Sequence, residues 1–225
     1  MKLLIDSANL EAIARIIDLF PIAGVTTNPT ILLREKRDPW QSLSAIRKLI
    51  GDDLQLHSQV VSQNAGGMVE EAEYIRDRLG ENTFIKVPVS QQGLKAIRKL
   101  SSQNFHVTAT AVYTPVQALL AATAGAEWLA PYINRLEMIG SNGVQVAGEI
   151  QKLLENQHSQ SAVLAASFKN VEQILQVLLT GVTGITAAPE VIETLLNHPL
   201  TDKAIEDFTC DFEKLTAAGQ TLMSI

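Results

Sequence analysis

The feature that most constrains the fold of this chain is a repeated alternation of two hydrophobic patterns. Short apolar runs rich in β-branched residues alternate with longer segments in which apolar residues recur at helical spacing. Eight such runs occur, at residues 2–6, 24–28, 54–61, 83–89, 106–113, 127–133, 162–168 and 184–189. Eight strand–helix units predict an α/β fold in which residues 1–225 form a single (β/α)8 TIM barrel domain.

A doubly wound open sheet would show the same alternation and is the alternative fold. It is disfavoured because Asp6-Ser7-Ala8-Asn9 follows the first run, where a glycine-rich phosphate loop would be expected. Asp38-Pro39 and Thr114-Pro115 each place a capping side chain before a proline, which predicts two helix starts. The last segment, about residues 201–225, is predicted to be an extra C-terminal helix beyond the barrel.

Composition excludes several classes of partner and cofactor. The net charge is −6 with dispersed Lys and Arg, which disfavours nucleic-acid and anionic-membrane surfaces but permits an anionic small substrate. The absence of an uninterrupted run of about 18 apolar residues argues against a membrane span, and the start of the chain does not resemble a signal peptide. The single cysteine, Cys210, and the lack of zinc-ligand spacing predict a cytoplasmic protein without a bound metal.

Polar residues end seven of the predicted strands, at the end of a barrel where active sites form. Each has an ordinary structural explanation, such as a helix cap, a turn or a hydrogen bond to a neighbouring strand. Their shared position predicts a functional site at the barrel mouth. The residues are Asp6, Asn28, Gln59, Lys86, Thr110, Tyr132 and Ser167.

Lys86 is the strongest candidate because it interrupts the apolar strand Phe84–Val89. Burying an ammonium group is costly, and a buried lysine tends to lose its proton. A neutral amine can add to a ketone and form an imine, which makes Lys86 the predicted nucleophile. The alternative is a buried ion pair with Asp6 or another carboxylate.

The other residues have expected roles around an imine at Lys86. Water held by Gln59, Thr110 and Tyr132 would transfer protons, and Tyr132 is the best titratable candidate. Asp6 and Asn28 would orient the lysine and the substrate hydroxyls.

Residues at the sixth and seventh strand ends are candidates for binding an anionic tail. Arg135 and Ser167 predict a phosphate site, although Arg135 could instead be a surface charge at a helix start. Lys169 is expected to be solvated. His57 lies two residues before Gln59 and is interpreted as a hydrogen-bonded core histidine.

Five segments of the chain resemble the small transaldolase-like proteins of the transaldolase family. They are Gly24–Pro29, Lys86–Val89, Thr110–Tyr113, Ala130–Arg135 and Ala165–Lys169. The resemblance implies a (β/α)8 barrel with the imine-forming lysine on strand four, no metal or organic cofactor, and a homodecamer of two pentamers. Within the family the chain is most similar to the fructose-6-phosphate aldolase subgroup, which implies reversible cleavage of fructose 6-phosphate to dihydroxyacetone and glyceraldehyde 3-phosphate.

The sequence leaves two other functions open. Transaldolases use the same lysine to transfer the dihydroxyacetone unit between sugar phosphates, but they typically carry Glu at the position of Gln59 and Phe at that of Tyr132. Both residues here are of the aldolase type. A non-catalytic sugar-phosphate-binding barrel is the third possibility, and it is disfavoured because a binding protein gains nothing from burying an amine.

Overall fold

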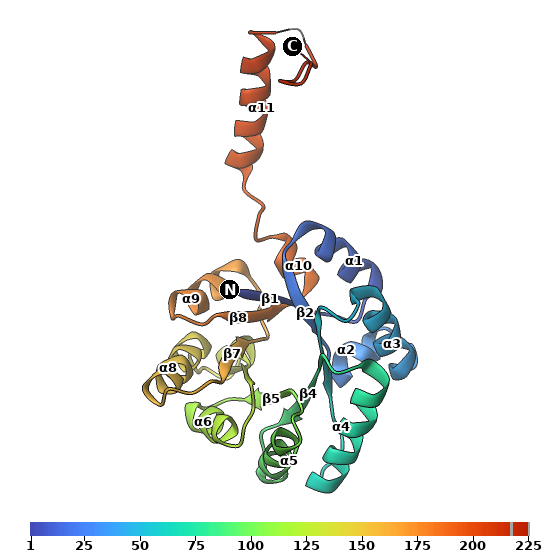
Figure 1. The fold of residues 1–225 in the computed structure, drawn as a ribbon. Helices are drawn as coiled ribbons and strands as arrows, with labels where there is room; N and C mark the ends of the chain where they lie inside the picture. The colour runs from blue at the N-terminus through green and yellow to red at the C-terminus, as the bar shows by residue number, and fades with distance from the viewer. Residues whose placement is uncertain (217, 225) are drawn as a thin grey trace. The chain divides into compact units, whose positions relative to one another are not determined.

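The computed structural model describes residues 1–216 and 218–224, and its central feature is a closed ring of eight parallel strands (Figure 1). Neighbouring strands pair in chain order from β1 to β8, and β8 closes the ring by pairing with β1. Helices surround this ring. The predicted TIM barrel is therefore confirmed, and the open doubly wound sheet is excluded.

All eight predicted strands are present, with ends that differ from the predicted ends by a few residues. They are β1 (Lys2–Asp6), β2 (Ile22–Thr26), β3 (Gln55–Gln59), β4 (Thr83–Pro88), β5 (Val107–Val112), β6 (Trp128–Pro131), β7 (Ala162–Ala165) and β8 (Gly184–Ala187). The helices are α1 (Leu10–Leu19), α2 (Pro29–Arg34), α3 (Pro39–Ile50), α4 (Ala65–Leu79), α5 (Gln91–Ser102), α6 (Pro115–Thr123), α7 (Ile133–Glu137), α8 (Gly143–Asn156), α9 (Val171–Leu179), α10 (Pro189–Glu193) and α11 (Pro199–Glu213). No helix in the described part of the chain is both long and apolar enough to span a membrane.

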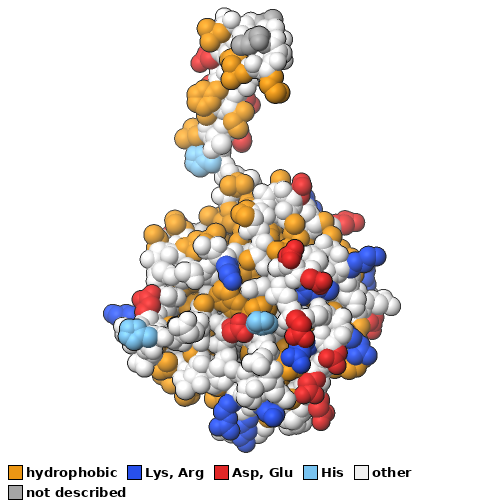
Figure 2. Space-filling view, viewed as in Figure 1, with side chains coloured by type: hydrophobic (Ala, Val, Ile, Leu, Met, Phe, Trp, Pro, Cys, Tyr) orange, Lys and Arg blue, Asp and Glu red, His pale blue; other side chains and the backbone are white. Residues whose placement is uncertain are grey.

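The chain divides into two compact units, residues 1–192 with the barrel and residues 193–225 with α11. The predicted C-terminal helix is confirmed, but it ends at Glu213 and so covers only part of the predicted span 201–225. Residues 217 and 225 of that span lie outside the described residues. None of the α11 residues is buried, and hydrophobic side chains are visible on the surface of this unit in Figure 2. The expectation of one domain over residues 1–225 stays a prediction.

Side-chain caps fix where many of the helices begin. The Asp38 and Thr114 side chains accept hydrogen bonds from the backbone N–H groups of Gln41 and Gln117, as predicted from the proline that follows each. Asn28 does the same for α2. Such caps stabilise the free N–H groups of a first turn, so they fix where these three helices begin.

Large apolar side chains fill the barrel interior toward the N-terminal ends of the strands. Leu4, Phe84, Trp128 and Leu164 form one buried cluster there. A side chain at Gly184 would place a Cβ 2.7 Å from the Trp128 ring, so the glycine leaves room for the indole. Because this cluster fills one end of the barrel, the inward polar residues two positions further along β1 and β4, Asp6 and Lys86, lie at the other end.

Candidate active site

A cavity of about 270 Å³ opens at the C-terminal ends of the strands. Six of the eight predicted site residues line it: Asp6, Asn28, Lys86, Tyr132, Arg135 and Ser167. They come from five different strand–loop connections. Their assembly in one cavity is the arrangement expected for the mouth of a TIM barrel.

Lys86 lies at the floor of this cavity and is nearly inaccessible, with 4% of its surface exposed. Its Nζ atom donates a hydrogen bond of 2.7 Å to the carbonyl oxygen of Thr27. Burial lowers the pKa of Lys86 below the ordinary lysine value of 10.5, and the negative charge of Asp6 opposes this effect. The lysine is therefore easier to deprotonate than a surface lysine, and its amine is directed by a fixed acceptor.

A chain of hydroxyl groups holds the Asp6 carboxylate. Thr26 Oγ1 donates to Asp6 Oδ1 at 2.6 Å and also lies 2.7 Å from Thr186 Oγ1. A carboxylate only accepts, so the single Thr26 proton is used on Asp6 and Thr186 must donate to Thr26. This chain, from three neighbouring strands, fixes the orientation of Asp6 beneath the cavity.

Tyr132 and Thr110 form a second hydroxyl pair, with 2.8 Å between the Tyr132 hydroxyl and Thr110 Oγ1. Thr110 does not line the cavity itself but reaches it through this bond. Burial raises the pKa of Tyr132 above its ordinary value, and the bond from Thr110 and the charge of Arg135 act in the opposite direction. The phenol is therefore neutral at physiological pH and can donate or accept a proton through a hydrogen bond.

A bulge in β5 directs Thr110. The pairing of β5 with β6 passes from Ala109–Leu129 to Val112–Pro131, which leaves one extra residue on β5. Ala111 in this segment has φ +55°, in the left-handed region that few non-glycine residues adopt. Bulges of this kind re-aim side chains near active sites.

Asn28 combines a structural and a site position. Its Oδ1 atom accepts from the backbone N–H of Ile31 at 3.0 Å and so caps α2. Within the described residues its side-chain Nδ2 has no hydrogen-bond partner, and this group is available to a ligand in the cavity.

Arg135 and Ser167 lie together at the rim. The Arg135 guanidinium is 4.7 Å from the Tyr132 ring centroid, and Nη1 donates to the Tyr113 hydroxyl at 3.5 Å, which raises the pKa of Arg135. The Ser167 backbone has φ +66°, and its carbonyl accepts from the N–H of Asn134. This backbone strain at the rim is typical of a position constrained by function.

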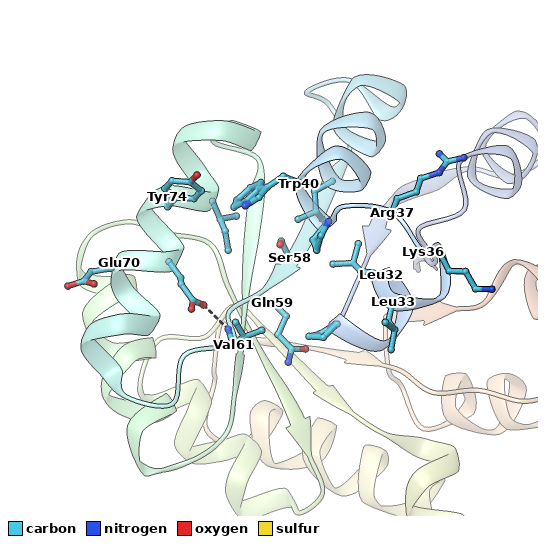
Figure 3. A pocket seen from close by; sticks show the side chains of 15 residues that line it. Leu32, Leu33, Lys36, Arg37, Trp40, Ser58, Gln59, Val61, Glu70 and Tyr74 are labelled. Carbon is cyan, nitrogen blue, oxygen red and sulfur yellow. Dashed lines mark hydrogen bonds between the residues drawn. The ribbon is translucent and has the colours of Figure 1, made fainter.

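Gln59 pairs with Lys86 across β3 and β4, but it lines a different cavity. This second cavity, of about 920 Å³, is here called the α2–α4 groove, and its wall includes Leu32, Leu33, Trp40 and Tyr74 (Figure 3). The backbone of the loop that follows Gln59 is held by Glu71, whose carboxylate accepts from the N–H of Val61 at 2.7 Å.

His57 is fully buried and hydrogen-bonded on both ring nitrogens. Nδ1 lies 2.9 Å from Thr108 Oγ1 and Nε2 lies 3.2 Å from Gln55 Oε1. The amide oxygen of Gln55 can only accept, so Nε2 carries the proton and Nδ1 accepts from Thr108. Burial lowers the pKa of His57 well below 6.5, and the positive charge of Lys86 is the next largest cause of this decrease. The ring is thus a neutral core histidine, as its position suggested.

Several residues of the site were not predicted. No distinctive sequence signal marks the carbonyl of Thr27 or the hydroxyls of Thr26 and Thr186. Thr26 does lie two residues before Asn28, so its side chain is expected on the same, inward face of the strand. Arg34 also lines the cavity. It was not predicted because an arginine at the end of a helix is common on protein surfaces and gives no sign of a binding role. In the described residues, no cluster of three or more His, Cys, Asp or Glu side chains is placed to hold a metal ion.

The fold and the site define a class of barrel protein with a buried lysine amine at its mouth. Residues 3–223 match the model of the Transaldolase/Fructose-6-phosphate aldolase family, and the chain belongs to this family. It is 41% identical over 213 residues to a probable fructose-6-phosphate aldolase of Streptococcus pneumoniae (strain ATCC 700669 / Spain 23F-1), covering 94% of this chain and 96% of that relative.

Two solved structures share the fold at low sequence identity. A cube-shaped, highly porous cage designed by fusing symmetric oligomeric domains matches with TM-score 0.62 and 16% identity, over 97% of this chain and 79% of that one. A structure titled native KDPGal matches with TM-score 0.56 and 20% identity, over 83% of this chain and 81% of that one. At these identities the similarity supports the barrel fold alone.

Proposed function

We propose that this chain is a class I aldolase that reversibly cleaves fructose 6-phosphate to dihydroxyacetone and glyceraldehyde 3-phosphate through an imine at Lys86. The observation that carries the proposal is the buried Lys86 amine, held by the Thr27 carbonyl at the floor of a polar cavity. The family and the 41% identical relative support the same activity.

The first step is attack of the neutral Lys86 amine on the C2 carbonyl of the ketose. Addition gives a carbinolamine, and loss of water gives a protonated imine. Burial favours this step because it lowers the pKa of the lysine. Asp6, held by Thr26, then lies where its charge can stabilise the cationic imine.

The second step breaks the C3–C4 bond. A base takes the proton of the C4 hydroxyl, the C3–C4 electron pair moves toward the imine, and glyceraldehyde 3-phosphate leaves an enamine on Lys86. Protonation of C3 and hydrolysis then release dihydroxyacetone and the free amine. Tyr132, bound to Thr110, is assigned the proton transfers through a water molecule. The role of Gln59 in holding this water stays a prediction, because Gln59 lines the α2–α4 groove and shares only its strand register with Lys86.

The remaining residues are assigned to substrate binding. The free amide N–H group of Asn28 would donate to a hydroxyl of the ketose. Arg135 and Ser167, which lie at the rim, would bind the phosphate at the far end of the substrate.

The test is incubation with fructose 6-phosphate, with and without erythrose 4-phosphate, followed by assay of glyceraldehyde 3-phosphate and free dihydroxyacetone. Both products without acceptor are expected. Sodium borohydride with the donor should attach the donor covalently to the wild-type chain and leave Lys86→Met unmodified. A Lys86→Met variant with normal turnover would refute the imine.

A transaldolase is the second candidate because it would use the same lysine. The Tyr132 hydroxyl favours the aldolase, since it gives the enamine a proton source that releases free dihydroxyacetone. Product formed in quantity only with erythrose 4-phosphate would establish the transaldolase instead.

We also propose a homodecamer of two pentamers in the cytoplasm. The family resemblance is the basis for the decamer, and the exposed apolar residues of α11 support self-association: Leu200 is 69%, Ile205 60% and Phe208 72% exposed. The single exposed cysteine, Cys210, suits a reducing compartment. Light scattering on the purified protein tests the mass, and a monomer at micromolar concentration would refute the decamer.

A further inference from the structure

The rim of the active-site cavity concentrates positive charge in a chain whose net charge is −6. Its lining contains Arg34, Arg135 and Lys169 in addition to the buried Lys86. Among the described residues that line it, Asp6 is the one carboxylate. Asp6 accepts from Thr26 and its charge acts on Lys86, so the rim cations are left to face whatever enters the cavity.

The three rim cations come from opposite sides of the opening. Arg135 and Lys169 follow β6 and β7, whereas Arg34 ends α2, which follows β2. In the closed ring, β8 and β1 lie between these two groups. At the end of β8 the lining consists of Ala187 and Ala188, whose side chains are small and uncharged.

Arg34 has no structural role that would occupy its guanidinium. Across residues 1–216 and 218–224, this group forms no hydrogen bond or ion pair, and the residue is exposed. The Asn28 cap and Pro29 fix the helix that carries it. A favourable interaction with the helix C-terminus would be its only other contribution, and that is small at an exposed position.

We propose that Arg34 is a specificity-determining residue that binds the substrate phosphate from the side opposite Arg135 and Ser167. The phosphate then lies over Ala187 and Ala188 between two guanidinium groups, each of which can donate two N–H groups to its oxygens. This inference rests on the proposed function, because it assigns a further ligand to the same sugar phosphate. It makes the enzyme prefer phosphorylated over unphosphorylated aldehydes.

The test is aldol addition of dihydroxyacetone to glyceraldehyde 3-phosphate and, separately, to glyceraldehyde. Arg34→Ala should raise the KM for glyceraldehyde 3-phosphate about three- to tenfold, the range expected for one exposed charged contact to a dianion. The KM for glyceraldehyde and both kcat values should change less than about twofold, since the proposal assigns Arg34 to the phosphate and not to the reacting atoms. Arg34→Lys should restore much of the difference, and added salt should reduce it.

Arg37→Ala is the matched control, because Arg37 is an exposed cation three residues further on that lines the α2–α4 groove instead. It should leave the ratio of the two KM values unchanged. An Arg34→Ala effect that is equal for both aldehydes, or equal to that of Arg37→Ala, overturns the assignment while the aldolase stands.

Failure of the proposed function gives a different result. The wild-type chain would then show no cleavage and no borohydride adduct. In that case calorimetric titration with inorganic phosphate still decides on Arg34: weaker binding to Arg34→Ala than to wild type supports the phosphate site, and equal binding overturns it.

Discussion

The hydrogen bond between Thr110 and Tyr132 gives a sharp test of the proton-transfer assignment. Thr110→Val preserves the size of the side chain and removes the one described partner of the Tyr132 hydroxyl. Tyr132→Phe removes the hydroxyl itself. If Thr110 acts only by positioning Tyr132, its substitution should matter little once the Tyr132 hydroxyl is gone.

The structure sets the expected magnitudes. The bond is 2.8 Å long and partly buried, so its loss should cost about 1 kcal/mol, and up to about 2 kcal/mol if the hydroxyl finds no new partner. That corresponds to a decrease in kcat of roughly 5- to 30-fold for Thr110→Val. Tyr132→Phe should slow cleavage by about 10²- to 10⁴-fold, the usual contribution of a positioned acid–base group.

The assay is kcat for cleavage of fructose 6-phosphate in both single variants and in the double variant. The kcat of the double variant should be at most about twofold lower than that of Tyr132→Phe, which gives a coupling energy of about 0.5–2 kcal/mol. Thr108→Val is the matched control, because Thr108 lies two residues earlier on β5 and binds His57 instead. Its effect should multiply with that of Tyr132→Phe. If the effect of Thr110→Val also multiplied with that of Tyr132→Phe, the role of Thr110 in positioning Tyr132 would be refuted.

Two further predictions concern stability. Burial lowers the pKa of Lys86, so the unfolded chain binds this proton more tightly than the folded chain does, and a protonated Lys86 destabilises the fold. Lys86→Met should therefore raise the melting temperature at neutral pH. This gain should shrink as pH rises toward about 10.5, the ordinary pKa of lysine. A pH-independent change in thermal unfolding would contradict this account. A Cβ at Gly93 would collide with the carbonyl oxygen of Pro88 at the end of β4, so Gly93→Ala should destabilise by about 1–3 kcal/mol in urea unfolding. Gly66→Ala, also in a first helical turn but with only a 3.4 Å contact, should be neutral or stabilising by up to about 1 kcal/mol, and equal losses in the two variants would refute the steric reason.

Much of the fold follows from local patterns in the sequence. Eight apolar runs of strand length could close into a barrel because each is followed by a helix, and capping side chains such as Asp38 and Thr114 mark where many of the helices begin. Strand ends were less well defined, since residues such as Asn28 cap the next helix rather than extend the strand. A polar residue between a strand and a helix could either extend the strand or cap the helix. Only the pairing of the strand with its neighbours in the folded barrel decides which of the two occurs.

The candidate site was predictable where a residue type conflicts with its surroundings. Lys86 stands out because a charged group interrupts an apolar strand. Thr26 and Thr186 do not, because threonine is common in strands and its hydroxyl has a partner only once the ring is closed. The bulge at Ala111 was also hidden, since alanine gives no signal of a left-handed backbone.

Arg34 and Gln59 illustrate a second limit, which is that chain position does not determine the cavity that a side chain lines. The alternation of side chains along β3 predicts that Gln59 faces the barrel interior, and it pairs with Lys86, yet it lines the α2–α4 groove. Arg34 follows no strand end directly, yet α2 carries it to the active-site rim. Helix α2 contributes lining residues to both cavities, so the cavity that a side chain lines depends on the packing of this helix and not on position along the chain.

The two opposing influences on Lys86 imply a constraint on this site. Burial lowers the pKa of the lysine and Asp6 raises it, so neutralising Asp6 would favour the free amine. Yet the proposed imine would be cationic, and without the Asp6 charge it would lose the one carboxylate in the described lining of the cavity. In the proposed mechanism, an Asp6 carboxylate fixed by Thr26 lowers the fraction of neutral Lys86 amine but stabilises the cationic intermediate. Catalysis favours such an arrangement when charge develops after the attack.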